Sequence, residues 1–253
     1  MRTMTNNDNF LGRKIFFLYP SAVVLNRITE ELIQQEFEVY VIKDHIKIRG
    51  ILKKHPNSIV FVNIYDGMSE AEWEIWIKGV MAETAGVGIG IISPGEDEAV
   101  REKYLNQIKI PCGYTVLKSD LNLVLTQLFE ILKIADAKGR RKYIRAVVDN
   151  EANTTVNLPI NGTFINGTIK YISVVGFSCF FADDTELTKN SLFQDIQIRL
   201  QSSIIKAEGI VFGSRMDGNT KIYVVLFTQR MDSEVRAKIR RFIQSNLQAK
   251  MDA

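Results

Sequence analysis

Two hydrophobic patterns follow one another along this chain. In the first, short apolar runs alternate with amphipathic stretches whose apolar residues recur every three or four positions, as in helices. This pattern predicts strands at residues 15–18, 39–42, 59–64, 88–92 and 114–117, and helices at residues 22–36, 45–54, 69–81, 96–107 and 120–137. Apolar strands that alternate with helices are typical of a parallel sheet covered on both faces. Residues 13–137 therefore predict an α/β domain, which follows a polar N-terminus, residues 1–12, that we expect to be disordered.

The second pattern begins after Gly139 and consists of strand-length runs separated by turn residues. The predicted strands are residues 146–149, 156–160, 167–171, 176–181, 193–200, 203–213 and 222–227. The turn signals between them are Asn161-Gly162, Asn166-Gly167, Asp183-Asp184 and Asp217-Gly218. Six or seven strands at this spacing indicate an antiparallel barrel, and the apolar stripe that follows Asp232-Ser233 predicts a C-terminal helix. The second domain is therefore all-β and covers residues 146–253.

Composition agrees with two soluble domains. The 253 residues are enough for two cores, and the contents of 46% apolar and 24% charged residues are ordinary for globular proteins. The net charge of +3 is too small for a protein whose whole surface binds nucleic acid, so we do not expect nucleic acid as the partner. Basic clusters at residues 138–145 and 236–241 nevertheless leave a nucleic-acid-binding regulator as an alternative.

The cysteines and the apolar runs indicate a cytoplasmic protein without a membrane span. Cys112 and Cys179 fall in different halves and have neither metal-ligand nor disulfide spacing, which fits a reducing compartment. The apolar run after Arg13 and Lys14 could begin a signal peptide, but it continues directly into charged helical sequence and reads better as a strand and helix. No run approaches the ~20 apolar residues that a membrane helix needs.

The segment between the two domains carries the candidate chemistry. Arg141 and Arg145 are four positions apart, and two guanidinium groups at this spacing suit phosphate oxygens and the edge of a guanine. Further along, Ser173 and Gly176 are three apart in a strand-and-turn setting, where a backbone can approach a ligand closely. An RxxxR segment followed by a strand with SxxG resembles the PilZ domain, the family of cyclic di-GMP receptors.

This resemblance covers about residues 138–250 and implies a β-barrel that binds cyclic di-GMP. Arg141 and Arg145 match the arginines of the family, and Ser173 and Gly176 match its serine and glycine. In the family, the arginine segment folds over the nucleotide and the Ser–Gly strand forms the floor of the pocket. An arginine immediately before the motif is associated with capture of an intercalated ligand dimer, and Arg140 stands at that position.

Tyr171 departs from the family pattern, which is usually D/N-x-S-x-x-G. The aromatic side chain replaces a carboxylate or amide that would accept a hydrogen bond from a guanine or orient an arginine. We expect the ring to stack on a base instead, and we include Tyr171 among the ligand-binding residues. The alternative that Tyr171 motivates is a degenerate PilZ interaction module that binds no nucleotide.

The first domain resembles the receiver domain of response regulators, a flavodoxin-like arrangement. That family has an acidic pair after the first strand, a phosphoacceptor Asp after the third, a hydroxyl after the fourth and a lysine after the fifth. The corresponding residues here are Tyr19-Pro20, Asn63, Ser93 and Lys118, with Asp66 read as a turn residue. Because the metal-binding and phosphoacceptor carboxylates are missing, the first domain is predicted to be a pseudo-receiver without phosphotransfer.

The predicted protein is a receptor and not an enzyme, because no set of residues suggests catalysis, a metal site or a cofactor. Cyclic di-GMP would bind at residues 138–145 and the barrel, change the arrangement of the two domains and signal to a protein partner, with motility as a plausible output. Two smaller expectations concern packing. Trp73 and Trp76 should be core or interface residues, and His45 should lie on a helix surface.

Overall fold

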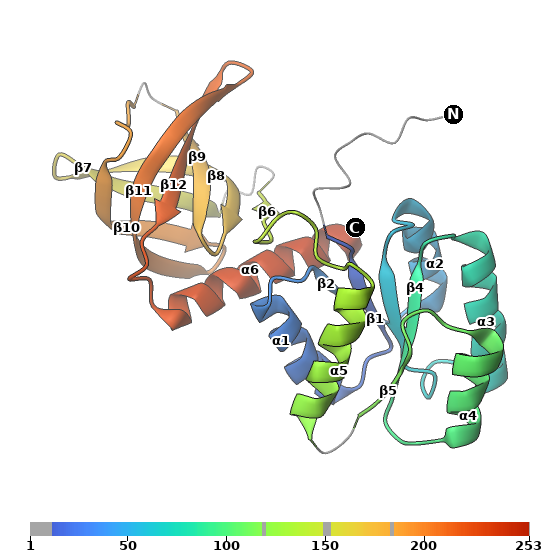
Figure 1. Ribbon diagram of the computed structural model, residues 1–253. Helices are drawn as coiled ribbons and strands as arrows, with labels where there is room; N and C mark the ends of the chain where they lie inside the picture. The colour runs from blue at the N-terminus through green and yellow to red at the C-terminus, as the bar shows by residue number, and fades with distance from the viewer. Residues whose placement is uncertain (1–11, 118–119, 149–152, 183–184, 253) are drawn as a thin grey trace. The chain divides into compact units, whose positions relative to one another are not determined.

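The computed structural model describes residues 12–117, 120–148, 153–182 and 185–252, and the chain divides into two units, residues 1–142 and 143–253 (Figure 1). The division falls within the predicted linking segment, residues 138–145. Nearly all of the N-terminal stretch, residues 1–12, for which disorder was predicted, lies outside the described residues. Within the described ranges, no helix is both long and apolar enough to span a bilayer.

Unit 1 contains a five-stranded parallel sheet with the strand order β2-β1-β3-β4-β5, which is the flavodoxin-like order. Its strands are β1 Ile15–Leu18, β2 Val39–Ile42, β3 Ile59–Val62, β4 Gly88–Ser93 and β5 Tyr114–Val116. Its helices are α1 Thr29–Gln34, α2 His45–Lys54, α3 Glu70–Glu83, α4 Glu98–Glu102 and α5 Leu121–Ile134. Two π-helical segments, Val24–Ile28 and Lys103–Ile108, precede α1 and follow α4.

The strands of unit 1 are mostly apolar because helices cover both faces of the sheet (Figure 1). All four residues of β1 are buried, and Ile15 and Phe17 belong to the core beneath α1 and α5. Figure 1 shows α2, α3 and α4 on the other face. Local signals fix the helix starts, as in α3, where the Ser69 hydroxyl accepts from the Glu72 amide and the Glu72 carboxylate accepts from the Ser69 amide.

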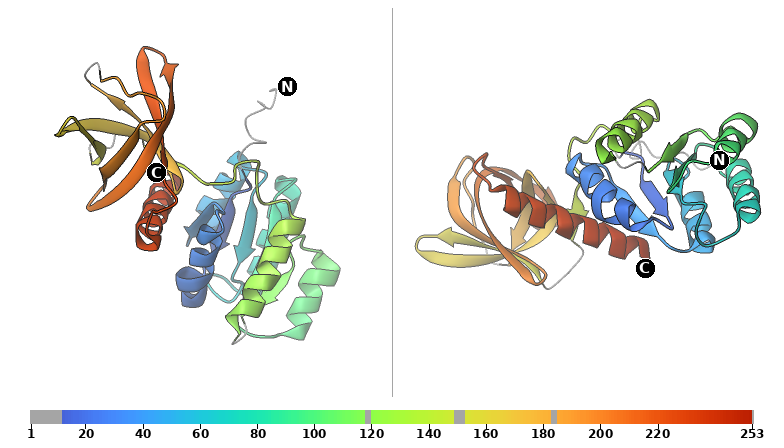
Figure 2. Two further views of the ribbon diagram at one scale, coloured as in Figure 1. Left: turned by 60° about the vertical axis from the view of Figure 1, so that its left-hand side comes forward. Right: turned by 90° about the horizontal axis from the view of Figure 1, so that it is seen from below.

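Unit 2 is an antiparallel barrel with a C-terminal helix. Its strands are β6 Ala146–Val147, β7 Thr154–Ile160, β8 Thr163–Ser173, β9 Gly176–Phe181, β10 Leu192–Leu200, β11 Ser203–Asp217 and β12 Thr220–Phe227. The order is β6-β8-β7-β10-β11-β12-β9, and a further β8–β9 pairing closes six of these strands into a ring. The helix, α6 Ser233–Asp252, lies across one end of the barrel (Figures 1 and 2).

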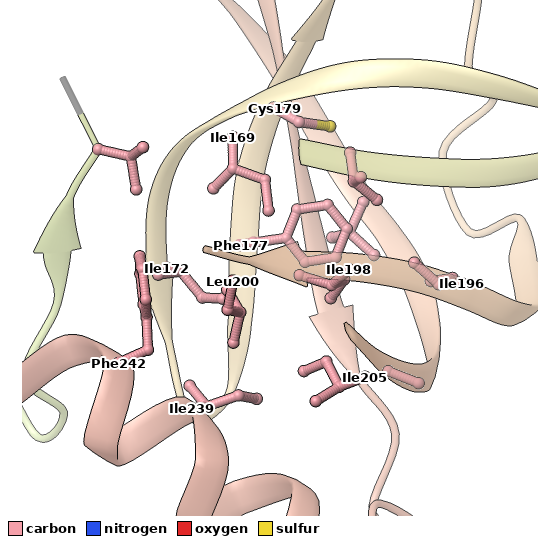
Figure 3. Close-up of a cluster of buried hydrophobic side chains, with 14 of the residues drawn as sticks. Ile169, Ile172, Phe177, Cys179, Ile196, Ile198, Leu200, Ile205, Ile239 and Phe242 are labelled. Atoms are coloured by element: carbon pink, nitrogen blue, oxygen red, sulfur yellow. The ribbon is translucent and has the colours of Figure 1, made fainter. Parts of the chain in front are cut away.

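The interior of the barrel is filled by the inward side chains of all its strands (Figure 3). Ile239 and Phe242 of α6 extend into this cluster and close its end. The burial pattern of β7 alternates at its start, as expected for strands with one face in a core and one outside. The predicted fold class is confirmed: an α/β domain with a parallel sheet followed by an antiparallel barrel and a C-terminal helix.

One predicted turn is wrong. Asn166-Gly167 lies inside β8, where Gly167 pairs with Phe181 of β9. A Cβ at Gly167 would lie 2.7 Å from the Phe181 ring. The absence of a side chain at Gly167 therefore lets this ring cover the strand, and β8 continues through the glycine without a turn. Asn161-Gly162 is a turn as predicted, with both residues at positive φ (50° and 81°), as a tight hairpin requires. The predicted turn at Asp183-Asp184 lies outside the described residues.

Candidate functional site: a pocket on the outer face of the barrel

A pocket of ≈ 190 Å³ lies on the outer face of the barrel in unit 2. It is lined by Arg145, Tyr171, Ile172, Ser173, Val175, Gly176, Phe177, Ser178, Arg215, Val224 and Leu226. Four of the residues predicted from the sequence, Arg145, Tyr171, Ser173 and Gly176, are thus in one pocket. The other two, Arg140 and Arg141, belong to the last residues of unit 1 and do not line it.

The floor of the pocket is made by rows of residues that face each other across neighbouring strands. In one row, Tyr171 of β8 pairs with Ser178 of β9, Ser178 with Val224 of β12, and Val224 with Gly213 of β11. Side chains directly opposite one another in antiparallel strands share a face and are in contact range. The order of strands around the pocket is therefore β6, β8, β9, β12 and β11.

Ser173 and Gly176 shape the floor through packing and a hydrogen bond. They face each other at the ends of β8 and β9, and the buried Ser173 hydroxyl donates to the Gly176 carbonyl at 3.1 Å. A Cβ at Gly176 would lie 2.3 Å from the carbonyl oxygen of Val225, so only glycine lets β12 approach here. Ser173 and Gly176 thus close the hairpin between β8 and β9 and allow it to pack closely against β12.

Arg145 is held in position by the residues around it. Tyr143 and Ile144 pack against the barrel core just before it, and Val147 just after it pairs with Tyr171. The Arg145 side chain itself is exposed, and within the part of the chain that the structure describes it has no ion-pair partner. A fixed backbone with a free guanidinium suits the binding of an anion or a guanine edge.

Tyr171 is partly buried at the centre of this arrangement. The Lys170 ammonium lies 5.8 Å from the centre of its ring, a cation–π distance. Opposite Tyr171, the Ser178 hydroxyl is buried and has no hydrogen-bond partner among the described residues. The pocket therefore contains an aromatic ring that can stack on a base and a buried hydroxyl that no atom of the described residues satisfies.

Sequence reasoning missed two polar residues of the pocket, Ser178 and Arg215. Arg215 lies on β11, exposed, and near an ion pair between Lys170 of β8 and Asp217 of β11. The hydrogen bond within this pair raises the pKa of Lys170 and lowers the pKa of Asp217. The only signal that could have found either residue is the strand register, which the sequence alone does not give.

In unit 1, the predicted receiver positions hold loops together at the carboxyl end of the sheet. The Asn63 amide nitrogen donates to the Tyr19 carbonyl at 3.0 Å, and its oxygen accepts from the Tyr65 amide at 3.2 Å. The Ser93 hydroxyl donates to the Gly95 carbonyl. Asp66 accepts from the Gly67 amide at 2.7 Å, as expected for a turn residue. These side chains therefore form hydrogen bonds with the nearby backbone, and the cavity that Asn63 lines together with Pro20 has a volume of only ≈ 10 Å³.

The pseudo-receiver interpretation remains a prediction. Lys118, the residue proposed for the lysine position, lies outside the described residues. Among the described residues there is no group of three or more His, Cys, Asp or Glu side chains that could hold a metal ion. Trp73 and Trp76 are buried, as predicted for core residues. His45 is partly buried instead of lying on the helix surface, because the Tyr19 hydroxyl lies 3.1 Å from its Nδ1 and Trp73 packs against its ring.

Comparison with known proteins gives similarity to solved structures only, since no protein-family model and no curated protein matches the chain. The PilZ domain with c-di-GMP of YcgR from Escherichia coli is 16% identical, with a TM-score of 0.36 over 42% of this chain and 90% of that one. The inhibitor of motility MotI/DgrA of Bacillus subtilis is 17% identical, with a TM-score of 0.35 over 41% of this chain and 49% of that one. The MrkH–c-di-GMP complex of K. pneumonia is 18% identical, with a TM-score of 0.35 over 44% of this chain and 52% of that one. The chain thus spans about half the length of the last two proteins.

Proposed function

We propose that this protein is a PilZ-type receptor that binds cyclic di-GMP in the outer pocket of its barrel and catalyses no reaction. The main support for this proposal is that Arg145, Tyr171, Ser173 and Gly176 line one pocket. Arg145 belongs to the RxxxR segment, whereas Ser173 and Gly176 belong to the SxxG strand, and the fold brings these two separate motifs to one pocket.

The chemistry of the pocket suits a guanine dinucleotide. Cyclic di-GMP carries two phosphates and two guanines, and a guanidinium can pair with phosphate oxygens, with the O6/N7 edge of guanine, or with a purine face. Tyr171 offers a ring for base stacking beside a floor that is partly apolar, with Val224 and Leu226. Arg140 and Arg141 lie within five residues of Arg145 along the chain, so the whole segment can fold over a nucleotide. Arg140 favours an intercalated ligand dimer.

Binding would also carry the signal. A segment that orders on the ligand and links two units can change their arrangement, and a protein partner that regulates motility would recognise the change. A cytoplasmic location fits this role. Cys112 and Cys179 are both buried and unbonded, as expected in a reducing compartment.

Calorimetric titration with cyclic di-GMP tests the proposal. Arg141→Ala and Arg145→Ala should each weaken binding by ~2 kcal/mol or more, because each removes a charge-assisted contact. Arg199→Ala is the matched control, since Arg199 is exposed on β10 and does not line the pocket. Unchanged affinity in both the Arg141→Ala and the Arg145→Ala variant would place the binding site elsewhere.

Tyr171 motivates the alternative of an interaction module that binds no nucleotide. In that case the wild type would not bind, and Tyr171→Asp would create binding by restoring an acceptor. Under the proposal, the wild type binds and Tyr171→Ala weakens it through lost stacking, by ~1–3 kcal/mol. Oligonucleotides titrated in parallel test the remaining alternative, a nucleic-acid-binding regulator.

A further inference from the structure

Arg215 reaches the pocket from the side opposite Arg145. Arg145 immediately precedes β6, which pairs with β8, whereas Arg215 lies on β11, beyond β9 and β12. Both side chains line the same pocket, and both are exposed. The floor between the two arginines consists of Tyr171, Ser178 and Val224 in cross-strand register. The pocket thus has a guanidinium on each of two facing walls.

The Arg215 guanidinium is available to a ligand. In the described part of the chain it forms no ion pair. The carboxylate of Asp217, two residues further along the same strand and therefore on the same face, is paired with Lys170 of β8. Lys170 thus neutralises the acidic group that would otherwise compete for Arg215.

The backbone of β11 leaves room beside Arg215. The strand has a bulge between Val211 and Gly213, and Gly213 is the residue opposite Val224 of the floor. A Cβ built on Gly213 would meet no atom within 4 Å, so the space above this part of the floor is open. Bulges beside binding sites commonly redirect a strand in this way.

We propose that Arg215 binds a phosphate of the nucleotide across the pocket from Arg145. This inference rests on the proposed function and extends it: the receptor would hold its ligand between cations on two walls, and only one of them belongs to the RxxxR segment. A ligand with phosphates on two sides, such as a cyclic dinucleotide, can satisfy both walls at once, whereas a ligand with a single phosphate can satisfy one.

The test compares the full-length wild type with Arg215→Ala, Arg215→Lys and the control Arg199→Ala in cyclic di-GMP titrations at several salt concentrations. Arg215→Ala should weaken binding about tenfold or more, the usual effect of losing a charge-assisted hydrogen bond. Its affinity should also fall less steeply with added salt, because one ionic contact is gone. Arg215→Lys should keep the salt dependence of the wild type and part of its affinity, and Arg199→Ala should behave as the wild type.

Each of the other possible results would contradict the role of Arg215, its assignment to a phosphate, or the proposed function. If the wild type and Arg199→Ala bind and Arg215→Ala binds as tightly, Arg215 is no ligand-binding residue, although the proposed function stands. If Arg215→Ala binds weakly with an unchanged salt dependence, the contact is to a base and the phosphate assignment is wrong. If the wild type does not bind cyclic di-GMP at all, the proposed function fails, and the role of Arg215 fails with it.

Discussion

At the scale of single residues, two serines of the pocket floor make opposite contributions to stability. The Ser173 hydroxyl is buried and donates to the Gly176 carbonyl, whereas the Ser178 hydroxyl is buried without a partner among the described residues. Ser173→Ala should therefore lower the free energy of unfolding of the barrel by ~1 kcal/mol, the usual net value of a hydrogen bond. Ser178→Ala should leave it unchanged or raise it, because the lost hydroxyl was desolvated without compensation.

Hydrogen exchange of backbone amides in β8 and β9, without ligand, measures this difference within the barrel. Tryptophan fluorescence supplies an internal control: both tryptophans of the chain, Trp73 and Trp76, lie in unit 1, so their unfolding signal should not change in either variant. Equal destabilisation by both substitutions would mean that Ser178 does have a hydrogen-bond partner.

The residues of the pocket differ in how far the sequence could reveal them. Arg145, Ser173 and Gly176 were found because their spacing along the chain is itself the motif. Ser178 and Arg215 reach the pocket through cross-strand register, which depends on the bulges in β8 and β11. A one-residue shift in register moves a side chain to the other face of a sheet, so no pattern in a single strand could have identified these two residues.

At the scale of elements, the ion pair between β8 and β11 controls the charge at the edge of the pocket. If Lys170 is replaced by Met, the Asp217 carboxylate becomes free to pair with Arg215 on the same strand. Cyclic di-GMP binding should then weaken about fivefold, the order expected for a competing exposed ion pair of ~1 kcal/mol. The double variant Lys170→Met/Asp217→Asn should recover affinity, because the competing charge is removed.

The double variant also separates this explanation from a direct contact between Lys170 and the ligand, in which case the second substitution would recover nothing. Lys206→Met is the matched control, since Lys206 is exposed on β11 and does not line the pocket. A Lys170→Met variant that binds as tightly as the wild type would show that Asp217 does not compete for Arg215.

The elements themselves were largely predictable, and the error in β8 has an identifiable physical cause. Strands such as β9 were predicted with the bounds they have, because apolar residues and turn signals agree there. Strand β8 was predicted too short, since Asn166-Gly167 has the composition of a tight turn. The Phe181 ring that covers Gly167 comes from the neighbouring strand, so the competing influence is a tertiary contact that local sequence does not contain.

At the scale of the whole molecule, the change of hydrophobic period located the junction between the units. Helical periodicity ends near Ala137, alternation begins near Ala146, and the division at Lys142 falls between them. The sequence could not show how the two units influence each other's arrangement, because that influence depends on surfaces that form only on folding. A ligand can shift their arrangement only if it interacts differently with the alternatives, which makes the proposed signal measurable.

The native cysteines of the chain allow the arrangement of the units to be measured with spin labels on introduced cysteines, because both native thiols are buried. Cys112 and Cys179 are 3% and 0% exposed, and burial raises the pKa of the Cys179 thiol to about 12. Since the thiolate is the reactive form, neither should take up a thiol reagent in the folded protein. Lys54→Cys in α2 and Lys206→Cys in β11 then place one spin label on the surface of each unit.

Cyclic di-GMP should change the distribution of distances between these two labels, measured by double electron–electron resonance. The reason is that ordering of residues 138–145 on the ligand restricts the link between the units. The same labels in an Arg145→Ala background should show no change at a concentration that saturates the wild type, because the segment loses its anchor in the pocket. Tight binding with an unaltered distance distribution would contradict the interdomain mechanism while leaving nucleotide binding intact, and the partner would then have to recognise the ligand-bound barrel itself.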